Sequence, residues 1–270
     1  MSNGVSNGVI YVATGQEYLE LAQASAESLR AVAPGLAVDL FTDQDVAPGL
    51  FDRVHPVERV HARAKLECMG RSRFERTLYL DCDTLVVGDP SDGFGLLERF
   101  DLALAHDVRR ASGLIREGLE ETTPYGFPQL NSGVVFYRRG ARVRRFLADW
   151  AARFHASAQG RDQVVLKDML WRGDHGVRFW VLPPEYNLRR VTVLEAWEPL
   201  DARVKIIHSH RLMDHMRLRG AARVRGLERL LELERAALQA EWDAAGVAQA
   251  GRARWFVEKP ASGGRSGRTR

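Results

Sequence analysis

The chain has 270 residues, of which 45% are hydrophobic and 27% are charged, a composition typical of a folded globular protein rather than a disordered one. The formal net charge of +4 comes from residues 259–270, which hold Lys259, Arg265, Arg268 and Arg270 and no acid. The rest of the chain keeps 35 of the 39 basic residues, against 35 acidic ones. The total charge therefore gives no support to nucleic-acid binding.

The sequence also argues against a membrane-spanning protein and against a secreted one. The sequence holds no run of about 18 apolar residues, which a membrane-spanning helix needs. The first residues lack the basic start and apolar core of a secretory signal. Only Cys68 and Cys82 occur, without the spacing of a metal-ligand set or a disulfide framework. We therefore expect a cytoplasmic protein in a reducing setting, with no membrane span and no nucleic-acid partner.

The first part of the chain alternates predicted strands and helices. Residues 9–13 form a short apolar run, which predicts a buried strand. Thr14 and Glu17 have the spacing of a capping box, which predicts the start of a helix that ends near Pro34. Its expected buried face carries Tyr18, Leu21, Ala22, Ser25 and Leu29. Further along we expect a strand over 36–41, a helix over 59–75 and a strand over 77–80.

The pattern continues beyond residue 100. We expect strands over 102–105 and 133–137, a helix from about 143 to 154, and a helix over 217–244. Residues 108–127 are rich in glycine and show little periodicity, which predicts a loop or lid. Residues 260–270 are mostly Gly, Ser and Arg, which predicts disorder. Strand and helix alternation of this kind is typical of an α/β protein with a mostly parallel sheet flanked by helices.

The clearest chemical motif is Asp81-Cys82-Asp83, which directly follows the strand predicted over 77–80. Ligands of open α/β sheets bind beyond the carboxyl ends of the strands. Two carboxylates in one turn of chain are hard oxygen ligands, suited to Mn²⁺ or Mg²⁺ rather than to zinc. Without a cation they would repel each other, so the motif predicts a counter-ion. A solvated turn is the alternative interpretation.

Four segments, in order along the chain, resemble the GT-A nucleotide-sugar glycosyltransferases, and most of all the glycogenin-like family 8. They are residues 74–89 around Asp81-Cys82-Asp83, residues 130–136 (Leu-Asn-Ser-Gly-Val-Val-Phe), the pair Asp162-Gln163, and residues 204–208, which end in His208. The resemblance covers roughly residues 8–210. It implies a GT-A (Rossmann-like) fold.

The resemblance also implies a metal site and a donor. Asp81, Asp83 and His208 would hold Mn²⁺ (or Mg²⁺) against the two phosphates of a nucleotide-diphosphate sugar, with Asp81 alternatively facing the ribose. Such a cation stabilises the negative charge of the departing nucleoside diphosphate. His210, two residues further on, is the competing metal ligand. A structural histidine is the alternative interpretation of His208.

Further site residues follow from the resemblance, position by position. Asp162 and Gln163 would lie near the reacting face of the sugar, as the catalytic pair, although either could simply begin a helix. Asn131 and Ser132 would contact sugar hydroxyls, or form a turn. The remaining expected donor contacts are Val12, Ala13, Thr14, Lys65, Asn187 and Arg211. Lys65 could instead lie on a solvated helix face. Arg211 would replace the family's Lys-Pro-Trp stretch, which this chain lacks.

The predicted organisation has four parts. They are a flexible N-terminus over 1–7, a GT-A domain over 8–215, a C-terminal helical extension over 216–250 and a disordered basic tail over 251–270. The expected function is metal-dependent transfer of a sugar from a nucleotide-diphosphate donor, with a UDP-sugar favoured, to an unidentified acceptor, with retention. The alternatives are a catalytically impaired nucleotide-sugar-binding protein and, with less support, a haloacid-dehalogenase-type phosphatase.

Overall fold

The computed structural model describes residues 6–108, 118–197 and 202–246. These described residues leave out the expected basic tail over 251–270, the last residues of the expected helical extension, residues 1–5 of the expected flexible N-terminus, and residues 109–117 of the expected loop. Residues 118–127 form turns without a regular helix, as predicted for a loop. No helix in the described residues is long and apolar enough to cross a membrane.

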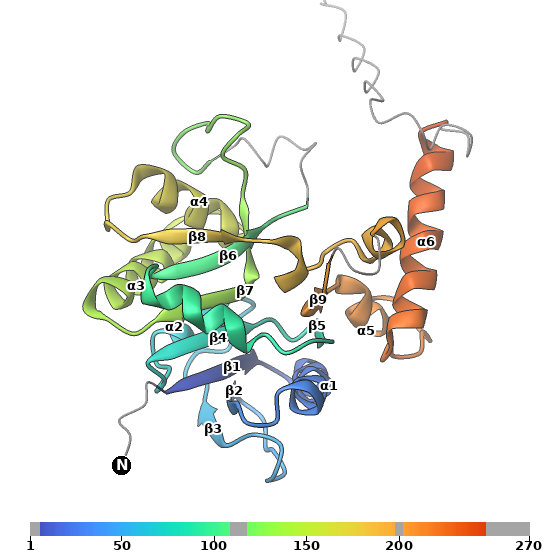
Figure 1. The fold of residues 1–270 in the computed structure, drawn as a ribbon, viewed down its shortest axis with the longest axis horizontal. Coiled ribbons are helices and arrows are strands. Elements are labelled where there is room, and N and C mark those ends of the chain that lie inside the picture. The colour runs from blue at the N-terminus through green and yellow to red at the C-terminus, as the bar shows by residue number, and fades with distance from the viewer. Residues whose placement is uncertain (1–5, 109–117, 198–201, 247–270) are drawn as a thin grey trace, which may run out of the picture.

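A seven-stranded sheet with the order β3-β2-β1-β4-β7-β6-β8 forms the centre of the molecule (Figure 1). A small antiparallel pair, β5 and β9, lies beside it. The strands are β1 (Asn7–Ala13), β2 (Ala37–Thr42), β3 (Arg53–Pro56), β4 (Arg76–Leu80), β5 (Thr84–Val86), β6 (Leu102–His106), β7 (Leu130–Arg138), β8 (Phe179–Leu182) and β9 (Ile206–His208). Only β7 runs antiparallel to its neighbours, β4 and β6, so the sheet is mostly parallel, as predicted.

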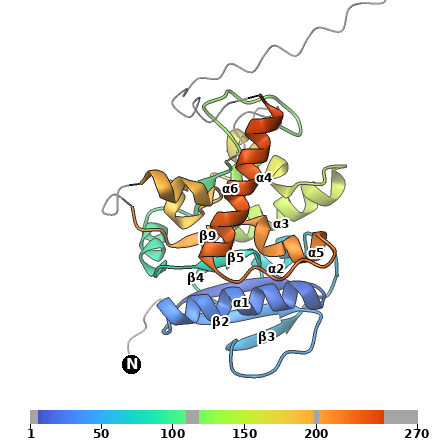
Figure 2. The same cartoon turned by 90° about the vertical axis from the view of Figure 1, so that its right-hand side faces the viewer.

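Helices cover both faces of the sheet. The α-helices are α1 (Gln16–Val32), α2 (Lys65–Met69), α3 (Ala141–Ala156), α4 (Asp162–Arg172), α5 (Asp214–Arg217) and α6 (Leu227–Ala244). Short 3-10 helices are η1 (Ser91–Glu98), η3 (Pro184–Tyr186), η4 (Val191–Ala196) and η5 (His210–Met213). Figure 1 shows α3 and α6 on opposite sides of the molecule, and in Figure 2 α6 lies in front of β9 and β5.

Alternation along the strands divides the core into two layers. In β1, Val9 and Tyr11 pack with α1, η1 and β9, whereas Ile10 packs with α2, α3 and α4 on the other face. This period of two is the geometry of a strand that is buried on both sides. Trp150 of α3 is fully buried in the second layer. The central strands are therefore held from both faces, and their carboxyl ends are fixed in place.

The first helix begins differently from the prediction. Thr14 does not cap it: Gly15 precedes the first helical residue with a φ of 78° and without a side-chain cap. Such a φ favours glycine, and the Gly15 N–H donates to Asp43 Oδ1 at 2.8 Å. Tyr18, expected on the buried face, is 38% exposed. The capping-box prediction was wrong, and both Thr14 and Tyr18 face the cavity described below.

Two other predicted helices are shorter than expected. The helix expected over 59–75 is only α2, with five residues, because Val60, which a buried helix face would cover, is 61% exposed. The helix expected over 217–244 starts at Leu227, because Gly220 adopts a φ of 80° and interrupts it. The segment around residues 57–64 is therefore an irregular stretch beside the sheet.

Candidate active site

Strand pairing brings the Asp-x-Asp motif and the late histidine together. Asp81 follows the last residue of β4, and Asp83 precedes the first residue of β5. The pairing of β5 with β9 sets Thr84 opposite His208, and the Ser209 N–H donates to the Asp83 carbonyl at 3.1 Å. Three residue pairs of this antiparallel ladder thus bring together side chains that lie more than 120 residues apart in the sequence.

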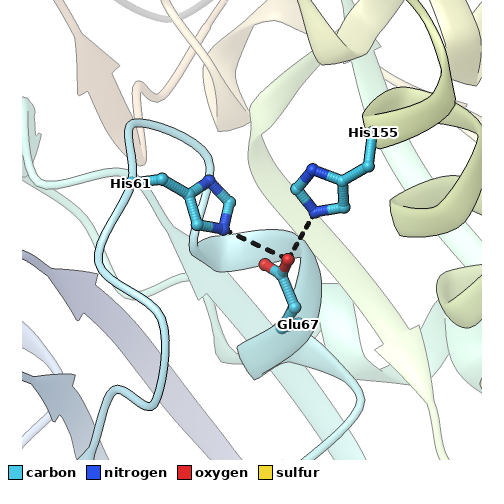
Figure 3. A group of neighbouring side chains, drawn as sticks. All are labelled: His61, Glu67 and His155. Atoms are coloured by element: carbon cyan, nitrogen blue, oxygen red, sulfur yellow. Dashed lines mark hydrogen bonds and ion pairs between the residues drawn. The ribbon is translucent and has the colours of Figure 1, made fainter.

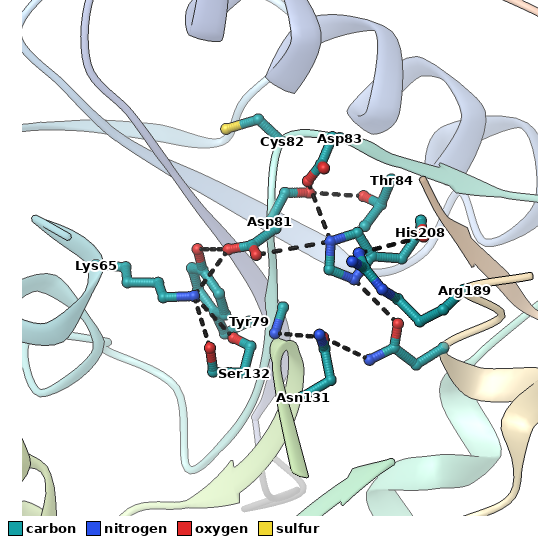
Figure 4. Close-up of polar contacts among 12 residues, drawn as sticks. Lys65, Tyr79, Asp81, Cys82, Asp83, Thr84, Asn131, Ser132, Arg189 and His208 are labelled. Carbon is teal, nitrogen blue, oxygen red and sulfur yellow. Dashed lines mark hydrogen bonds and ion pairs between the residues drawn. The ribbon is translucent and has the colours of Figure 1, made fainter. Parts of the chain in front are cut away.

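The three side chains converge on one point (Figure 4). His208 Nε2 lies 3.2 Å from Asp83 Oδ1 and 3.7 Å from Asp81 Oδ2, and one ligand atom from each residue lies within 4.8 Å of the others. Cys82 points elsewhere, because its buried thiol lies 3.2 Å from the Val12 carbonyl. Two carboxylates and one imidazole form a donor set that suits Mn²⁺ or Mg²⁺ better than a softer metal.

A chain of amides fixes the proton on His208. The Gly133 backbone N–H donates to Asn131 Oδ1 at 2.9 Å, which identifies that atom as the oxygen. Asn187 must then present Nδ2 to the same oxygen, at 2.9 Å, and its own Oδ1 lies 3.0 Å from His208 Nδ1. Nδ1 therefore carries a proton, and Nε2 is the ring nitrogen that faces Asp81 and Asp83, where a cation would bind it. The residues present fit a divalent cation.

Glycine at position 133 is required by the packing of the site. A Cβ atom there would lie 2.0 Å from Cε1 of His208 and 2.6 Å from Asp81 Oδ2. Extension of the β4–β7 ladder causes this closeness, because the Asp81 N–H donates to the Gly133 carbonyl at 2.7 Å. The imidazole therefore lies directly against the backbone of β7.

The other oxygen of Asp81 belongs to a buried network. Lys65 Nζ donates to Asp81 Oδ1 at 3.1 Å, and the Tyr79 hydroxyl donates to the same oxygen. Lys65 also donates to the carbonyl and the hydroxyl of Ser132, both at 3.1 Å, and lies 3.5 Å from Asp162 Oδ2. Burial alone would lower the pKa of Lys65, but Asp162 and Asp81 outweigh it and raise this pKa. The solvated-face alternative for Lys65 is wrong, because its side chain is buried.

Asp162 is held as an anion by one hydrogen-bond donor and two cationic side chains. Ser132 Oγ donates to its Oδ2 at 2.6 Å, Arg63 Nε lies 3.2 Å from its Oδ1, and Lys65 approaches as above. Burial alone would raise the pKa of Asp162, but the charge of Lys65, the Ser132 hydrogen bond and Arg63 together lower it. Asp162 is the first residue of α4, as predicted, yet its side chain does not cap the helix.

Gln163 and Asn131 are both oriented by Asp107. Gln163 Nε2 lies 3.2 Å from Asp107 Oδ2, and Asn131 Nδ2 lies 3.3 Å from the same oxygen. An ionised carboxylate only accepts hydrogen bonds, so each amide turns its NH₂ group toward it. The Oε1 atom of Gln163 is therefore left on the other side of the amide. Asp107 follows β6, and its N–H donates to Gln129 across the ladder at 2.9 Å.

An open cavity of about 620 Å³ joins these groups. Its lining includes Asp81, Asp83, Asn131, Ser132, Asp162, Gln163, His208, Lys65, Val12 and Thr14, all of which the sequence singled out. Ala13 is fully buried in β1 and does not line the cavity. Asn187 is also buried, and acts from behind His208 rather than from the cavity wall. His210 lines the cavity but is not one of the three converging ligands.

Arg211 does not take the place expected of it. Its guanidinium pairs with Asp214 at 3.4 Å and lies 3.9 Å from Glu234 of α6, and it is not among the residues lining the cavity. Neighbouring acids thus turn it toward the C-terminal helix. Arg189 and Arg217 line the cavity instead. They are the cations that a reading of the sequence missed.

Arg189 carries a charge without a close anionic partner in the described part of the chain. Its guanidinium donates to the His208 carbonyl at 3.4 Å, and its Nε atom is buried without a hydrogen-bond partner among the described residues. Burial would raise the pKa of Asp83, but the charge of His208 and its hydrogen bond, followed by Arg189, lower this pKa overall. A buried donor without a partner is costly, so the arrangement favours an anion in the cavity.

Known proteins with a similar architecture are glycosyltransferases. Crystal structures of the glycosyltransferase GlyE from Streptococcus pneumoniae TIGR4 and of a galactosyltransferase, LgtC, in complex with donor and acceptor sugar analogues each give a TM-score of 0.55. The GlyE alignment is 19% identical and covers 90% of this chain and 65% of that one. The LgtC alignment is 14% identical and covers 88% and 99%. The chain has a GT-A fold.

The sequence comparison agrees with this result. Glycogenin-1 of Caenorhabditis elegans is 28% identical over 183 residues, 63% of this chain and 35% of that protein. The chain therefore spans about a third of the length of this relative. No model of a known protein family matches it. The resemblance to glycogenin-like GT-A glycosyltransferases, inferred from four motifs, is confirmed.

Three site residues besides Arg189 and Arg217 lay outside the sequence prediction. Asp107 had a usable signal, because it lies two residues after the strand predicted over 102–105 and directly after β6. Tyr79 lies inside a strand, and its hydroxyl contact with Asp81 has no sequence pattern. Arg63 was assigned to a longer helix, which hid its reach to Asp162.

Proposed function

We propose that the chain is a metal-dependent glycosyltransferase that moves a sugar from a nucleotide-diphosphate donor to an acceptor with retention of configuration. A UDP-sugar is the first candidate donor and Mn²⁺ the first candidate cation. The observation that carries the proposal is the convergence of Asp81, Asp83 and Nε2 of His208 at the edge of the cavity. The fold and the glycogenin relative support the class of reaction. A cytoplasmic location stays a prediction.

Acidic and cationic side chains that line the same cavity support a diphosphate ligand. Asp81, Asp83 and His208 would hold the cation, whose chemistry is to stabilise the charge that develops on the departing nucleoside diphosphate. Arg189 and Arg217 line the cavity and form no ion pair with an acid of residues 6–108, 118–197 or 202–246, and we propose that they contact the phosphate oxygens. Guanidinium groups match phosphate geometry with paired donors. They would replace the Lys-Pro-Trp stretch that the chain lacks.

The orientation of Gln163 supports its place next to the reacting carbon. Asp162 has its carboxylate occupied by Ser132, Lys65 and Arg63, so it is poorly disposed to act as a nucleophile. Gln163 lines the cavity and keeps Oε1 free once Nε2 has bound Asp107. We therefore propose that Gln163 faces the sugar and that Asp162 positions its surroundings.

Isothermal titration with UDP, with and without Mn²⁺, tests the proposal. We expect binding that requires Mn²⁺ and is lost in Asp83→Ala. Sugar release from a UDP-sugar in the presence of Mn²⁺ distinguishes an enzyme from a protein that only binds the donor. Tight UDP binding without turnover of any donor would favour the binding-protein alternative, which the absent Lys-Pro-Trp stretch supports. Hydrolysis of p-nitrophenyl phosphate with Mg²⁺ would favour the phosphatase.

A further inference from the structure

A second group of metal-ligating side chains lies beside the cavity (Figure 3). It consists of His61, which precedes α2, Glu67 of α2 and His155 in the last turn of α3. Nε2 of His61 lies 3.1 Å from Glu67 Oε1, and Nε2 of His155 lies 2.5 Å from the same oxygen. The centroids of the two imidazole rings are 5.1 Å apart, and the ring planes meet at 71°. Both rings turn Nε2 toward the Glu67 carboxylate (Figure 3).

We propose that His61, Glu67 and His155 form a second divalent-metal site, one that binds Zn²⁺ or a similar transition metal. One ligand atom from each residue lies within 4.8 Å of the others, which is close enough for a shared ion. Two imidazole nitrogens and one carboxylate are a common ligand set for zinc. Glu67 Oε2 is buried and has no hydrogen-bond partner, and an ion would give this carboxylate a further partner.

The chemistry of this site differs from that of the first. Asp81, Asp83 and His208 offer two carboxylates and one imidazole, which favour Mn²⁺ or Mg²⁺. The second group offers two imidazoles and one carboxylate. The side chains of His61, Glu67 and His155 are 29%, 33% and 43% exposed. This exposure gives an ion a path from solvent and leaves room for water at its fourth position.

Metal binding requires both His61 and His155 to give up the Nε2 proton that they donate to Glu67. The Arg63 backbone N–H donates to His61 Nδ1 at 3.2 Å. Without an ion, the proton of the neutral His61 ring is therefore on Nε2, which donates a hydrogen bond to Glu67. An ion at Nε2 moves that proton to Nδ1 and gives up the long contact with Arg63. Two hydrogen bonds to Glu67 and the contact from the Arg63 backbone N–H are exchanged for three bonds to the metal.

The position of the site connects it to the active-site cavity. His61 itself lines the cavity, and the segment between His61 and Glu67 carries Arg63 and Lys65, both of which reach Asp162. A bound ion ties this segment to α3 through His155. The ion therefore stiffens the part of the chain that holds Asp162.

Titration with Co²⁺, followed by visible absorption, tests the proposal without reference to sugar transfer. Asp83→Ala removes the first site, and the chain should carry no affinity tag. In this background we expect one Co²⁺ per chain with the intense absorption of a tetrahedral site, displaced by Zn²⁺. Adding His155→Ala should weaken Co²⁺ binding by more than about tenfold. His61→Ala is expected to do the same.

The matched control is His175→Ala, because His175 pairs with Asp149 at 2.9 Å as His155 pairs with Glu67, yet belongs to neither metal group. It should leave Co²⁺ binding unchanged, and circular dichroism checks that every variant is folded. If the Asp83→Ala chain binds no Co²⁺, or if His155→Ala binds it as tightly as the parent, the cluster is only a hydrogen-bonded clamp and the proposal fails. Failure of UDP binding would leave this result untouched.

Discussion

Asn187 Oδ1 lies 3.0 Å from His208 Nδ1, while Nε2 of the same ring lies 3.2 Å from Asp83 Oδ1. The orientation of Asn187 is set by Asn131, whose oxygen is in turn identified by the Gly133 N–H. A backbone donor in β7 therefore determines which nitrogen of a histidine in β9 is free to bind a cation. The site is arranged by its supporting residues as much as by its ligands.

The first prediction concerns this support. Asn187→Leu removes the acceptor for His208 Nδ1 and leaves the ring free to change tautomer or rotate. Loss of such a partner typically weakens metal binding by about 10–100-fold. Titration of Mn²⁺ by electron paramagnetic resonance measures the affinity. Asn187→Asp keeps an acceptor for His208 and should retain more Mn²⁺ affinity than Asn187→Leu; equal affinities in these two variants would contradict the proposed role.

The second prediction concerns Gly133. Gly133→Ala places a Cβ atom 2.0 Å from Cε1 of His208, so the ring or β7 must move. We expect loss of Mn²⁺-dependent UDP binding in titration calorimetry and destabilisation of about 1–3 kcal/mol in urea unfolding, as for other overpacked sites. Gly95→Ala is the control, because a Cβ there meets nothing within 4 Å. Normal UDP binding by Gly133→Ala would show that the imidazole does not need this position.

The third prediction concerns Arg189, which lines the cavity. Arg189→Met should weaken UDP binding in the presence of Mn²⁺ by about tenfold or more, because it removes a donor to the phosphates. Uridine carries no phosphate, so its binding should change little. Arg190→Met is a matched control, since Arg190 is the exposed neighbour and does not line the cavity. Equal UDP affinity in Arg189→Met and Arg190→Met would rule out the phosphate contact.

The fourth prediction concerns pH. The folded chain lowers the pKa of Asp162 below the ordinary 3.8, so its ionised form adds stability at higher pH. This contribution is complete above 3.8 and is lost as the pH falls through the lowered pKa. Urea unfolding should therefore show a gap between the wild type and Asp162→Asn that is wide at pH 6 and narrows below 3.8. The gap for exposed Asp45→Asn should stay small throughout. A constant gap for Asp162→Asn would contradict the network.

The local sequence pattern was sufficient to predict much of the fold and the three residues of the candidate metal site. The strand before Asp81, the start of α4 at Asp162 and the late strand before His208 each have a short-range signature, and the structure has all three. Helix lengths were less predictable. The segment around Val60 reads as helical by composition, but its side chains are exposed or reach other elements. Glycine conformations, such as that of Gly15, also depend on neighbours that the pattern does not contain.

The supporting network was beyond the sequence for a physical reason. Lys65 was expected to face a diphosphate, whereas its partners Asp81, Ser132 and Asp162 come from three separate segments. Only tertiary packing reveals such a buried ion pair. Arg211 shows the converse, because its acidic neighbour Glu234 lies on a distant helix and draws it away from the cavity. Nearness in sequence to a metal ligand does not give nearness in space.

UDP titration calorimetry with and without Mn²⁺, on the wild type and Asp83→Ala, tests the central claim most directly. We expect the wild type to bind UDP only when Mn²⁺ is present, and Asp83→Ala to remain folded without binding under either condition. Asp83 contacts His208 at the point where the three ligand atoms converge, so its removal should eliminate the cation. Failure of the wild type to bind UDP or any other nucleoside diphosphate, or undiminished Mn²⁺-dependent binding by Asp83→Ala, would contradict the assignment of this site.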